Sequence, residues 1–292
     1  MSELAAAVER VWPGRDARYE VLGGGITNHN LRVEVDGEAF VLRVTGEHTD
    51  QLGIDRTVEL EATRVAAALG IGPEVIAFVE PEGWLVTRFV EGETPSLEHM
   101  REPAMLARVA AALRVFHDGA PIAGSFDSFR VVESYRDTAL ARGGTIPPTF
   151  ERAHELAGRI EGIRVGATAK PCHNDLLNAN FLWDATRLCI VDWEYAGMGD
   201  PFFDLANFTI NHGLDEDARR GLLEAYFGEF RAEDARGLEL MRFMSDFREA
   251  MWGLVQTAVS ALDFDFAAYA TEHFERLERT ATSRPFRAAL DP

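Results

Sequence analysis

The chain has 292 residues, 47% of them hydrophobic and 26% charged, a composition typical of a folded globular protein rather than a disordered one. Its formal net charge of −19 argues against a nucleic-acid partner, because binding a phosphate backbone requires clustered Lys and Arg. An acidic protein instead favours the approach of a cationic small molecule.

No stretch approaches the roughly 18 uninterrupted apolar residues that a membrane span requires. Residues 1–14 lack the cationic start and apolar core of a secretory signal. Cys172 and Cys189 lie in apolar runs and are expected to be buried thiols, since two cysteines make no disulfide framework. We therefore expect a cytoplasmic protein with no membrane span.

The first ninety residues are predicted to be rich in β-strands, with one helix. Strands are expected at 19–22, 29–35, 39–44, 75–79 and 84–90, and a hairpin turn at Asp36-Gly37 joins the second strand to the third. Residues 55–69 carry apolar side chains at helical spacing, and the Gly-Ile-Gly-Pro segment at 70–73 ends this helix.

After residue 91 the pattern is mainly helical. A helix is expected at 103–117, short strands at 170–172, 181–183 and 188–191, and helices rich in aromatic residues from Pro201 onward. We therefore predict an α+β, two-lobed protein-kinase-like fold. Residues 1–90 would form a small β-rich, nucleotide-binding N-terminal lobe, and residues 91–292 a larger, mainly helical C-terminal lobe that carries the catalytic and acceptor-binding residues.

The strongest functional signal is the segment 173–180, His-Asn-Asp-Leu-Leu-Asn-Ala-Asn, which lies on a loop between two short strands. An Asp followed five residues later by Asn is the spacing of a kinase catalytic loop, in which the Asp accepts the proton of the attacking hydroxyl and the Asn binds a metal ion. Here these are Asp175 and Asn180. Asp192 follows at the end of the next apolar strand, where a carboxylate can bind Mg²⁺. Asn and Asp residues that merely form turns would also fit one such loop, but would not explain all three positions.

These motifs resemble the choline/ethanolamine kinase family, which lies within the wider aminoglycoside phosphotransferase group. The resemblance is carried by residues 171–208, including Val-Asp-Trp-Glu-Tyr at 191–195 and Asp-Leu-Ala-Asn at 204–207. It implies that Asp175 is the catalytic base and that Asn180 and Asp192 bind Mg²⁺. It also implies that Asp204 holds the catalytic loop without touching substrate. Finally, it places Arg88 and Val90 at the hinge, where backbone C=O and N–H groups pair with adenine.

A glycine-rich turn precedes the strand at 29–35. Gly23, Gly24 and Gly25 alone are weak evidence, because three glycines usually mark only a turn. With the kinase motif downstream, this loop, the hydroxyl of Thr27 and the amide of Asn28 are predicted to cover the nucleotide phosphates.

A kinase also needs a cation on its third strand, paired with a helix carboxylate, to hold the α- and β-phosphates. The only lysine of the chain is Lys170, so the N-terminal lobe must use arginine. Arg43 stands at the right strand position, and the resemblance extends to arginine there. We predict Glu59 as its partner, since Glu61 faces another side of the helix. The alternative is that Arg43 is an exposed residue on an edge strand.

The acceptor pocket is predicted around the segment 247–256, which resembles the helix that lines the choline pocket in the family, and the segment 262–269 opposite it. Aromatic faces bind an ammonium group well when a carboxylate helps. The candidates are Trp252, Tyr195, Phe264 and Tyr269 for the faces and Glu194, Glu249 and Asp263 for the charge. Aromatic residues at helical spacing are, however, more often core.

Two positions depart from the family pattern. Glu249 stands where the family commonly has the first of two tryptophans three residues apart, and Leu177 stands two residues beyond the base, where a polar residue is frequent. A pocket with one tryptophan fewer and one carboxylate more would still hold choline, and would equally suit a primary ammonium, which donates hydrogen bonds.

We therefore predict an ATP- and Mg²⁺-dependent phosphotransferase acting on the hydroxyl of an amino alcohol, choline or ethanolamine. A kinase for another hydroxylated amine, such as an aminoglycoside or thiamine, is the first alternative. A catalytically silent nucleotide-binding module is the second, and it is disfavoured because Asp175, Asn180, Asp192 and Arg43 are all present. The sequence leaves the oligomeric state open.

Overall fold

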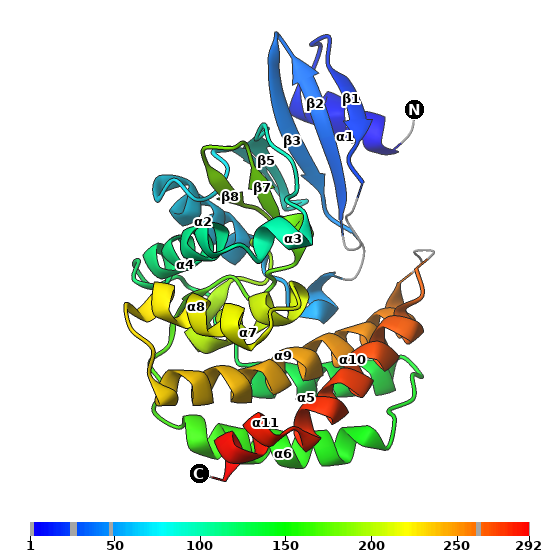
Figure 1. Cartoon of the computed structure of the whole chain (residues 1–292). Coiled ribbons are helices and arrows are strands. Elements are labelled where there is room, and N and C mark those ends of the chain that lie inside the picture. The colour runs from blue at the N-terminus through cyan, green and yellow to red at the C-terminus, as the bar shows by residue number, and fades with distance from the viewer. Residues whose placement is uncertain (1–2, 24–27, 47–48, 261–263, 292) are drawn as a thin grey trace. The chain divides into compact units, whose positions relative to one another are not determined.

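The computed structural model describes residues 3–23, 28–46, 49–260 and 264–291 (Figure 1). The chain forms two compact units, one made of residues 1–95 and 179–195 and the other of residues 96–178 and 196–292. The first boundary lies close to the predicted one at residue 90. The segment 179–195, which we assigned to the C-terminal lobe, belongs instead to the N-terminal unit.

A five-stranded antiparallel sheet in the order β1-β2-β3-β5-β4 forms the centre of the N-terminal unit. The strands are β1 (Arg18–Val21), β2 (His29–Val35), β3 (Glu38–Val44), β4 (Val75–Val79) and β5 (Trp84–Arg88). Asp36 and Gly37 both have positive φ, 54° and 81°, as a type I′ turn requires. The predicted strands and hairpin are confirmed.

Buried apolar residues alternate with more exposed ones along the β2–β3 hairpin, and the buried residues form the core of this unit. Every second residue of β2 and β3 is buried, and these apolar side chains pack with Ala7 and Val8 of α1 (Glu3–Val11), a helix that we did not predict. In Figure 1 this helix lies beside β1 to β3. The short helix η1 (Thr49–Leu52) was not predicted either.

The predicted helix after β3 is α2 (Arg56–Ala68). Asp55 caps it, because its side chain accepts hydrogen bonds from the backbone N–H groups of Thr57 and Val58. Gly70 follows the helix with φ of 76°, a conformation that favours glycine. This cap fixes the first turn of α2, which carries two of the site residues described below.

The segment 179–195 contains the helix η2 (Asn178–Asn180) at its start and the hairpin of β7 (Phe181–Trp183) and β8 (Leu188–Ile190). Trp183 and Glu93 exchange backbone hydrogen bonds of 2.9 and 3.1 Å, and the N–H of Ile190 donates to the carbonyl oxygen of Ile71 at 2.7 Å. These backbone bonds attach the hairpin to the N-terminal unit.

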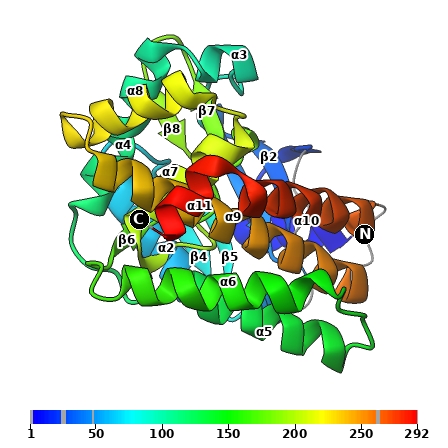
Figure 2. The same ribbon diagram turned by 60° about the horizontal axis from the view of Figure 1, so that its bottom comes forward.

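The C-terminal unit is mainly helical, as predicted. Its helices are α3 (Leu97–Met100), α4 (Pro103–His117), α5 (Ser128–Ala141), α6 (Thr149–Arg164), α7 (Pro201–Asn211), α8 (Glu216–Phe227), α9 (Ala232–Val259), α10 (Phe266–Thr282) and α11 (Arg284–Leu290). The long helix α9 packs against α5, α7 and α10, and Figure 2 shows α10 and α11 beside it. Among the described residues, no helix combines the length and the apolar character needed to cross a membrane.

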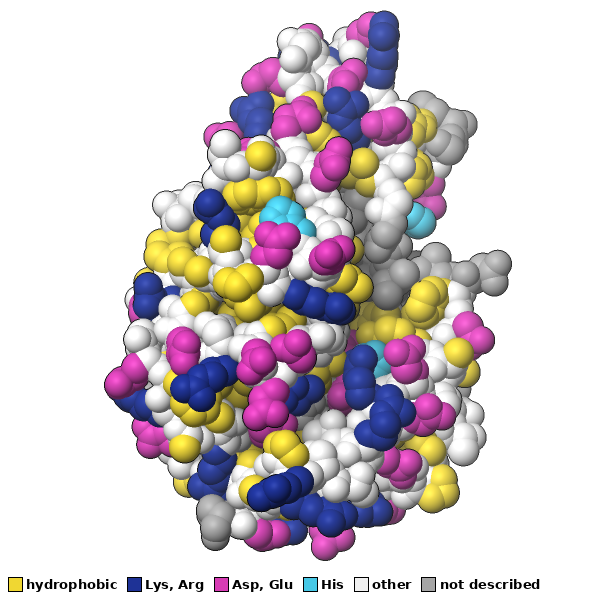
Figure 3. Space-filling model, viewed as in Figure 1, with side chains coloured by type: hydrophobic (Ala, Val, Ile, Leu, Met, Phe, Trp, Pro, Cys, Tyr) yellow, Lys and Arg dark blue, Asp and Glu magenta, His cyan; other side chains and the backbone are white. Residues whose placement is uncertain are grey.

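A two-stranded sheet of β6 (Lys170–Cys172) and β9 (Gly197–Gly199) precedes α7. β9 was not predicted, because Gly-Met-Gly has no strand pattern; a Cβ atom at Gly199 would lie 2.7 Å from the carbonyl oxygen of Phe126. The two cysteines are buried free thiols, as predicted. Acidic and basic side chains are interspersed on the face that Figure 3 shows.

Candidate active site

The predicted catalytic loop follows β6 and is anchored at its start by Asp204 of α7. The carboxylate of Asp204 accepts hydrogen bonds from the N–H groups of His173 at 2.8 Å and Asn174 at 2.6 Å, and it lies 2.9 Å from Nε2 of His117. Asn174 has a φ of 67°, an uncommon conformation that recurs at functional sites. The prediction that Asp204 holds this loop is confirmed.

Asp204 is fully buried, yet it is suited to remain charged. Burial acts to raise the pKa of its carboxyl group, but the hydrogen bond and charge of His117 and the N–H of His173 outweigh burial and lower it. An ionised Asp204 is the form that accepts both backbone N–H groups of the loop.

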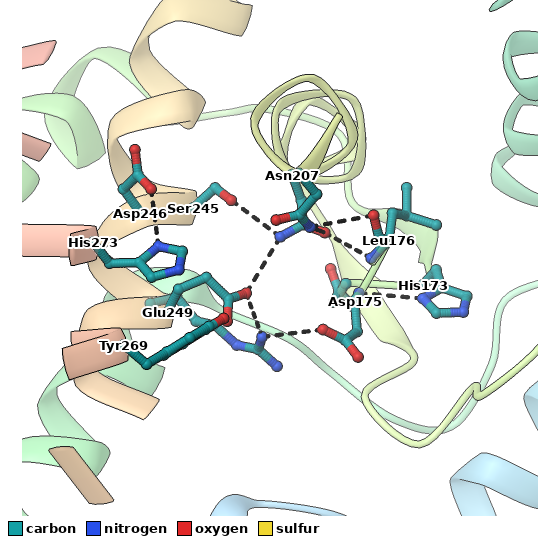
Figure 4. Close-up of polar contacts among 12 residues, drawn as sticks. His173, Asp175, Leu176, Asn207, Ser245, Asp246, Glu249, Tyr269 and His273 are labelled. Atoms are coloured by element: carbon teal, nitrogen blue, oxygen red, sulfur yellow. Dashed lines mark hydrogen bonds and ion pairs between the residues drawn. The ribbon is translucent and has the colours of Figure 1, made fainter. Parts of the chain in front are cut away.

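One turn further along α7, Asn207 anchors the other side of the loop. Its side-chain oxygen accepts a hydrogen bond from the N–H of Leu176 at 2.6 Å, and its Nδ2 donates to Ser245 at 3.1 Å and to Glu249 at 3.3 Å (Figure 4). Asp175, between the two anchored stretches of backbone, is therefore held from both sides. Asn207 lies in the quoted Asp-Leu-Ala-Asn motif, but we assigned it no role from the sequence.

The side chain of Asp175 faces a buried ion pair that the sequence analysis missed. Nη1 of Arg248 lies 3.4 Å from Oδ1 of Asp175 and 2.6 Å from Oε1 of Glu249. The hydroxyl of Tyr269 donates to Oε2 of Glu249 at 2.9 Å. Burial acts to raise the pKa of Glu249, but the charge of Arg248 outweighs it and the pKa is lowered. Both carboxylate oxygens of Glu249 thus have partners within the protein, which differs from our expectation of a free charge for the substrate. The only sequence signal was an adjacent pair of charged residues within a predominantly apolar helix.

In the N-terminal unit, acidic and basic side chains alternate in one network. Arg43 of β3 forms ion pairs with Glu59 of α2 and, at 2.9 Å, with Asp192. Arg56, which we did not predict, connects Glu59 at 2.6 Å to Glu194 at 3.0 Å.

Arg43 occupies an inner strand of the sheet, and its side chain is 12% exposed. Burial acts to lower the pKa of Arg43, but its attraction to Asp192, Glu59 and Glu194 outweighs burial and raises the pKa. The predicted pairing with Glu59 is confirmed, and the alternative of an exposed edge-strand arginine is wrong.

Two predicted residues belong to this network in an unexpected way. The side chain of Asn28 donates to Glu194 at 2.8 Å and accepts from Arg56 at 2.8 Å. Burial and the charge of Asp192 raise the pKa of Glu194 to about 7. Glu194 is therefore bonded to Asn28 and Arg56 of this network, and its place in the acceptor pocket stays a prediction. Tyr195, also predicted for the acceptor pocket, is buried in the same unit.

A cavity of about 370 Å³ opens beside this network within the N-terminal unit. Apolar side chains of the sheet and the β7–β8 hairpin line it together with polar residues that include Arg43, Asn180 and Asp192. A largely apolar cavity of this size with a few polar groups suits a small ligand that has an apolar and an anionic part.

The predicted hinge residues Arg88 and Val90 also line this cavity. The Arg88 side chain points to solvent-exposed carboxylates, Glu38 at 2.7 Å and Glu74 at 3.2 Å. Its own N–H donates to the backbone carbonyl of Glu74 at 2.8 Å. The Arg88 side chain is thus engaged elsewhere, and its backbone C=O is the group that stays a candidate for contact with a base.

Asn180 and Asp192 lie close together on neighbouring parts of the chain, because the N–H of Val191 donates to the carbonyl oxygen of Asn180 at 2.9 Å. Asp192 has a φ of 66°, in the left-handed region that few residues other than Gly, Asn and Asp adopt. A carboxylate and an amide oxygen lining one cavity are the hard donors that Mg²⁺ prefers, so these residues fit the predicted metal ion.

In the C-terminal unit, the structure brings together three of the aromatic residues predicted for the acceptor pocket. The rings of Trp252 and Tyr269 meet edge to face at 5.6 Å, and those of Phe264 and Tyr269 at 6.1 Å. Trp252 also contacts Phe266 at 5.7 Å and is 5% exposed, whereas Phe264 is 44% exposed. The predicted residues Gly24, Gly25, Thr27 and Asp263 lie outside the described residues.

Replacing Arg43 tests its predicted role in binding the phosphates of ATP. We expect Arg43→Ala to raise the KM for ATP by roughly ten- to a hundredfold, since a charge-assisted hydrogen bond contributes about 1.5–3 kcal/mol. Glu59→Gln should give a related but smaller defect, because Arg43 retains Asp192. Steady-state kinetics, with thermal melting as the control for folding, measure both. If Glu61→Gln has a larger effect than Glu59→Gln, the choice of carboxylate is wrong.

Comparison with known proteins identifies the family. The sequence profile described as the phosphotransferase enzyme family matches residues 18–243. Protein LicA of Haemophilus influenzae is 28% identical over 246 residues, which cover 80% of this chain and 72% of LicA. Ethanolamine kinase 2 of Mus musculus is 26% identical over 300 residues, which cover 91% and 76% of the two chains.

The crystal structure of a choline/ethanolamine kinase family protein from Mesorhizobium loti superposes with a TM-score of 0.84 at 30% identity, covering 99% of this chain and 98% of that one. The fold and the family match together define a phosphotransferase with a kinase-like fold. Within the phosphotransferase enzyme family, the chain belongs to the choline/ethanolamine kinases.

Proposed function

We propose that this phosphotransferase moves the γ-phosphate of ATP to the hydroxyl group of a small amino alcohol, choline or ethanolamine. The observation that carries the proposal is the environment of Asp175, whose carboxylate is on a doubly anchored loop in the same unit as the aromatic cluster of Trp252, Phe264 and Tyr269. The names of the relatives, an ethanolamine kinase and a choline/ethanolamine kinase family protein, support this acceptor class.

The protein's own groups account for the reaction as follows. Asp175 orients the acceptor hydroxyl and takes its proton as the hydroxyl oxygen attacks the γ-phosphorus, and ADP leaves. Arg43 holds the α- and β-phosphates through its guanidinium group, which Glu59 keeps in position. Asp192 and Asn180 would hold Mg²⁺, and a metal ion bound there would supply positive charge to the phosphates of ATP. Arg88 and Val90 would offer backbone groups to adenine.

In this protein, aromatic faces rather than a free carboxylate would bind the ammonium group of the acceptor. Glu249 is already bonded to Arg248 and Tyr269, so its charge is engaged within the protein. Trp252, Phe264 and Tyr269 remain as the aromatic surfaces, and Tyr195, Glu194 and Asp263 remain proposed from the family pattern. We further infer a cytoplasmic location, where ATP is available and thiols stay reduced.

A coupled ADP-release assay against choline, ethanolamine, thiamine and kanamycin tests the proposed acceptor. We expect turnover with choline or ethanolamine that exceeds both the rate without acceptor and the rates with the two other amines. Turnover with kanamycin or thiamine alone would show that the acceptor is an aminoglycoside or thiamine rather than choline or ethanolamine. ATP binding without turnover of any amine would favour a catalytically silent nucleotide-binding module.

Substitution of Trp252 tests the proposed acceptor pocket directly. Cation–π contacts in desolvated sites contribute roughly 2 kcal/mol, so Trp252→Ala should weaken acceptor binding by tens-fold and leave the affinity for ATP unchanged. Trp252→Phe, which keeps an aromatic face, should lose less. If Trp252 is only a core residue, the alanine variant should instead lose roughly 3–5 kcal/mol of folding stability and impair both substrates together, which thermal melting and kinetics distinguish.

A further inference from the structure

The predicted base, Asp175, has a cationic neighbour, Arg248, that is not part of the predicted catalytic loop. The loop residue two positions beyond Asp175 is Leu177, which has no polar side-chain atom. Nη1 of Arg248, on α9, instead lies 3.4 Å from Oδ1 of Asp175. Arg248 is 1% exposed, and it is among the largest buried side chains in the part of the chain that the structure describes.

Arg248 is itself held by groups from several elements. Glu249 accepts from its Nη1 at 2.6 Å, and the hydroxyl of Tyr135 on α5 is hydrogen-bonded to the guanidinium group. Glu249 in turn is fixed by Tyr269 of α10 at 2.9 Å and Asn207 of α7 at 3.3 Å. Figure 4 shows Glu249, Asn207, Tyr269 and Asp175 gathered around these contacts. Nη1 of the guanidinium group is therefore held in a fixed place beside Asp175.

The cluster around Arg248 contains one cation and two carboxylates. Two carboxylates, Asp175 and Glu249, share one guanidinium group, and an arginine does not give up its proton in proteins. A buried carboxylate beside a fixed cation stays ionised more readily than one in apolar surroundings. A general base must be ionised and correctly oriented before the reaction, and a cation at this place serves both needs.

We propose that Arg248 is a positioning residue for the phosphoryl transfer: it holds Oδ1 of Asp175 and so fixes the carboxylate in the orientation that receives the proton of the acceptor hydroxyl. The proton moves from the hydroxyl oxygen to the Asp175 carboxylate, and Arg248 neither gains nor loses one. The assignment rests on the proposed kinase function, and it explains how the base is oriented although position 177 is leucine.

Three variants separate positioning from simple structural support. Arg248→Met removes the charge at similar length, Arg248→Lys retains the charge without the planar fork, and the double variant Arg248→Met/Glu249→Gln also removes the carboxylate that the first change leaves unpaired. We expect Arg248→Met to lower kcat by about ten- to a hundredfold, the cost of misplacing a reacting group by about 1 Å, without changing the KM for ATP. Arg248→Lys should recover part of the loss.

The double variant decides between the two roles. Glu249→Gln relieves the buried, unpaired carboxylate, so thermal stability should recover toward that of the wild type. Under the positioning role kcat stays low, whereas a purely structural role predicts that kcat recovers together with stability. Recovery of kcat in the double variant would therefore overturn the proposal.

The pH dependence provides a second readout. The ionisable groups around the pair, besides Asp175 and Arg248, are Tyr135, His173, Glu249, Tyr269 and His273. Removing a cation next to a carboxylate favours its protonated form, so the acidic limb of the kcat–pH profile should move to higher pH in Arg248→Met and in the double variant. Glu249→Gln alone, which leaves Arg248 in place, should move the limb in the opposite direction or not at all.

A measurement that does not require enzymatic turnover tests the role of Arg248 independently of the proposed kinase activity. The carboxylate of Asp175 can be followed by ¹³C NMR in the full-length protein, with its signal assigned by its loss in Asp175→Asn. We expect the titration midpoint to rise in both variants that lack Arg248. An unchanged midpoint would overturn the role of Arg248, even if the kinase assay succeeds. A wild-type protein that phosphorylates no amine would refute the proposed function, while a raised midpoint would still support the pairing of Arg248 with Asp175.

Discussion

Asp175→Asn should lower kcat by roughly 10²–10⁴-fold, the usual contribution of a general base. Asparagine keeps the shape of the side chain and an oxygen that can accept from Arg248, but it cannot take the proton of the acceptor hydroxyl. The KM for ATP and the melting temperature should stay close to the wild-type values. Steady-state kinetics with saturating acceptor measure the loss.

The matched control for this variant is Asp137→Asn, the same chemical change at an exposed position of α5 in the same unit. It should leave kcat unchanged. Turnover by Asp175→Asn at nearly the wild-type rate would show that another group is the base, and the assignment of the loop 173–180 would have to be revised.

Asp192→Asn should abolish most of the activity and the effect of Mg²⁺ on nucleotide binding. A metal ion contributes several kcal/mol to stabilising transition-state charge, so the loss should be at least about a hundredfold. Asparagine is the better replacement than alanine, because the φ of 66° at this position is tolerated by asparagine and strained for alanine. Calorimetric titration with ATP, with and without Mg²⁺, measures the binding effect.

Two further variants separate metal binding from the ion pair that Asp192 makes with Arg43. Asn180→Ala should show a milder form of the same defect, relieved by higher Mg²⁺ concentration. Glu59→Gln alters the other partner of Arg43 and should leave the dependence on Mg²⁺ unchanged. If chelation of divalent metal does not reduce the activity of the wild type, the metal-dependent mechanism is wrong.

The sequence predicted those parts of the site that depend on short-range order. The hairpin at Asp36-Gly37 follows from the turn chemistry of two adjacent residues. Arg43 meets Glu59 because β3 and α2 are consecutive major elements, so strand position and helical periodicity were enough to choose the carboxylate. The spacing of Asp175 and Asn180 is a local property of one loop, and it was visible for the same reason.

Pairings between distant segments were not predictable in this way. The sequence of the hairpin at 179–195 does not indicate that it pairs with Glu93 and Ile71 of the N-terminal unit. These contacts are backbone hydrogen bonds, which do not depend on the identity of the side chains. Arg56 and Glu194 are 138 positions apart, and only the packing of α2 near the end of that hairpin brings them to 3.0 Å.

The sequence by itself therefore determined the fold class and the family resemblance, because hydrophobic periodicity and motif spacing are properties of the sequence. The same motif spacing predicted the catalytic and metal-binding residues. Tertiary structure alone decided the partners of Glu249. Glu249 appeared in the sequence as an additional charge for the substrate, but Arg248, the neighbouring residue, and Tyr269, on the next helix, occupy its oxygens. Burial makes an unpaired charge costly, so a buried carboxylate takes whichever partner the packing provides, and that partner is fixed only when α9, α10 and the catalytic loop are assembled.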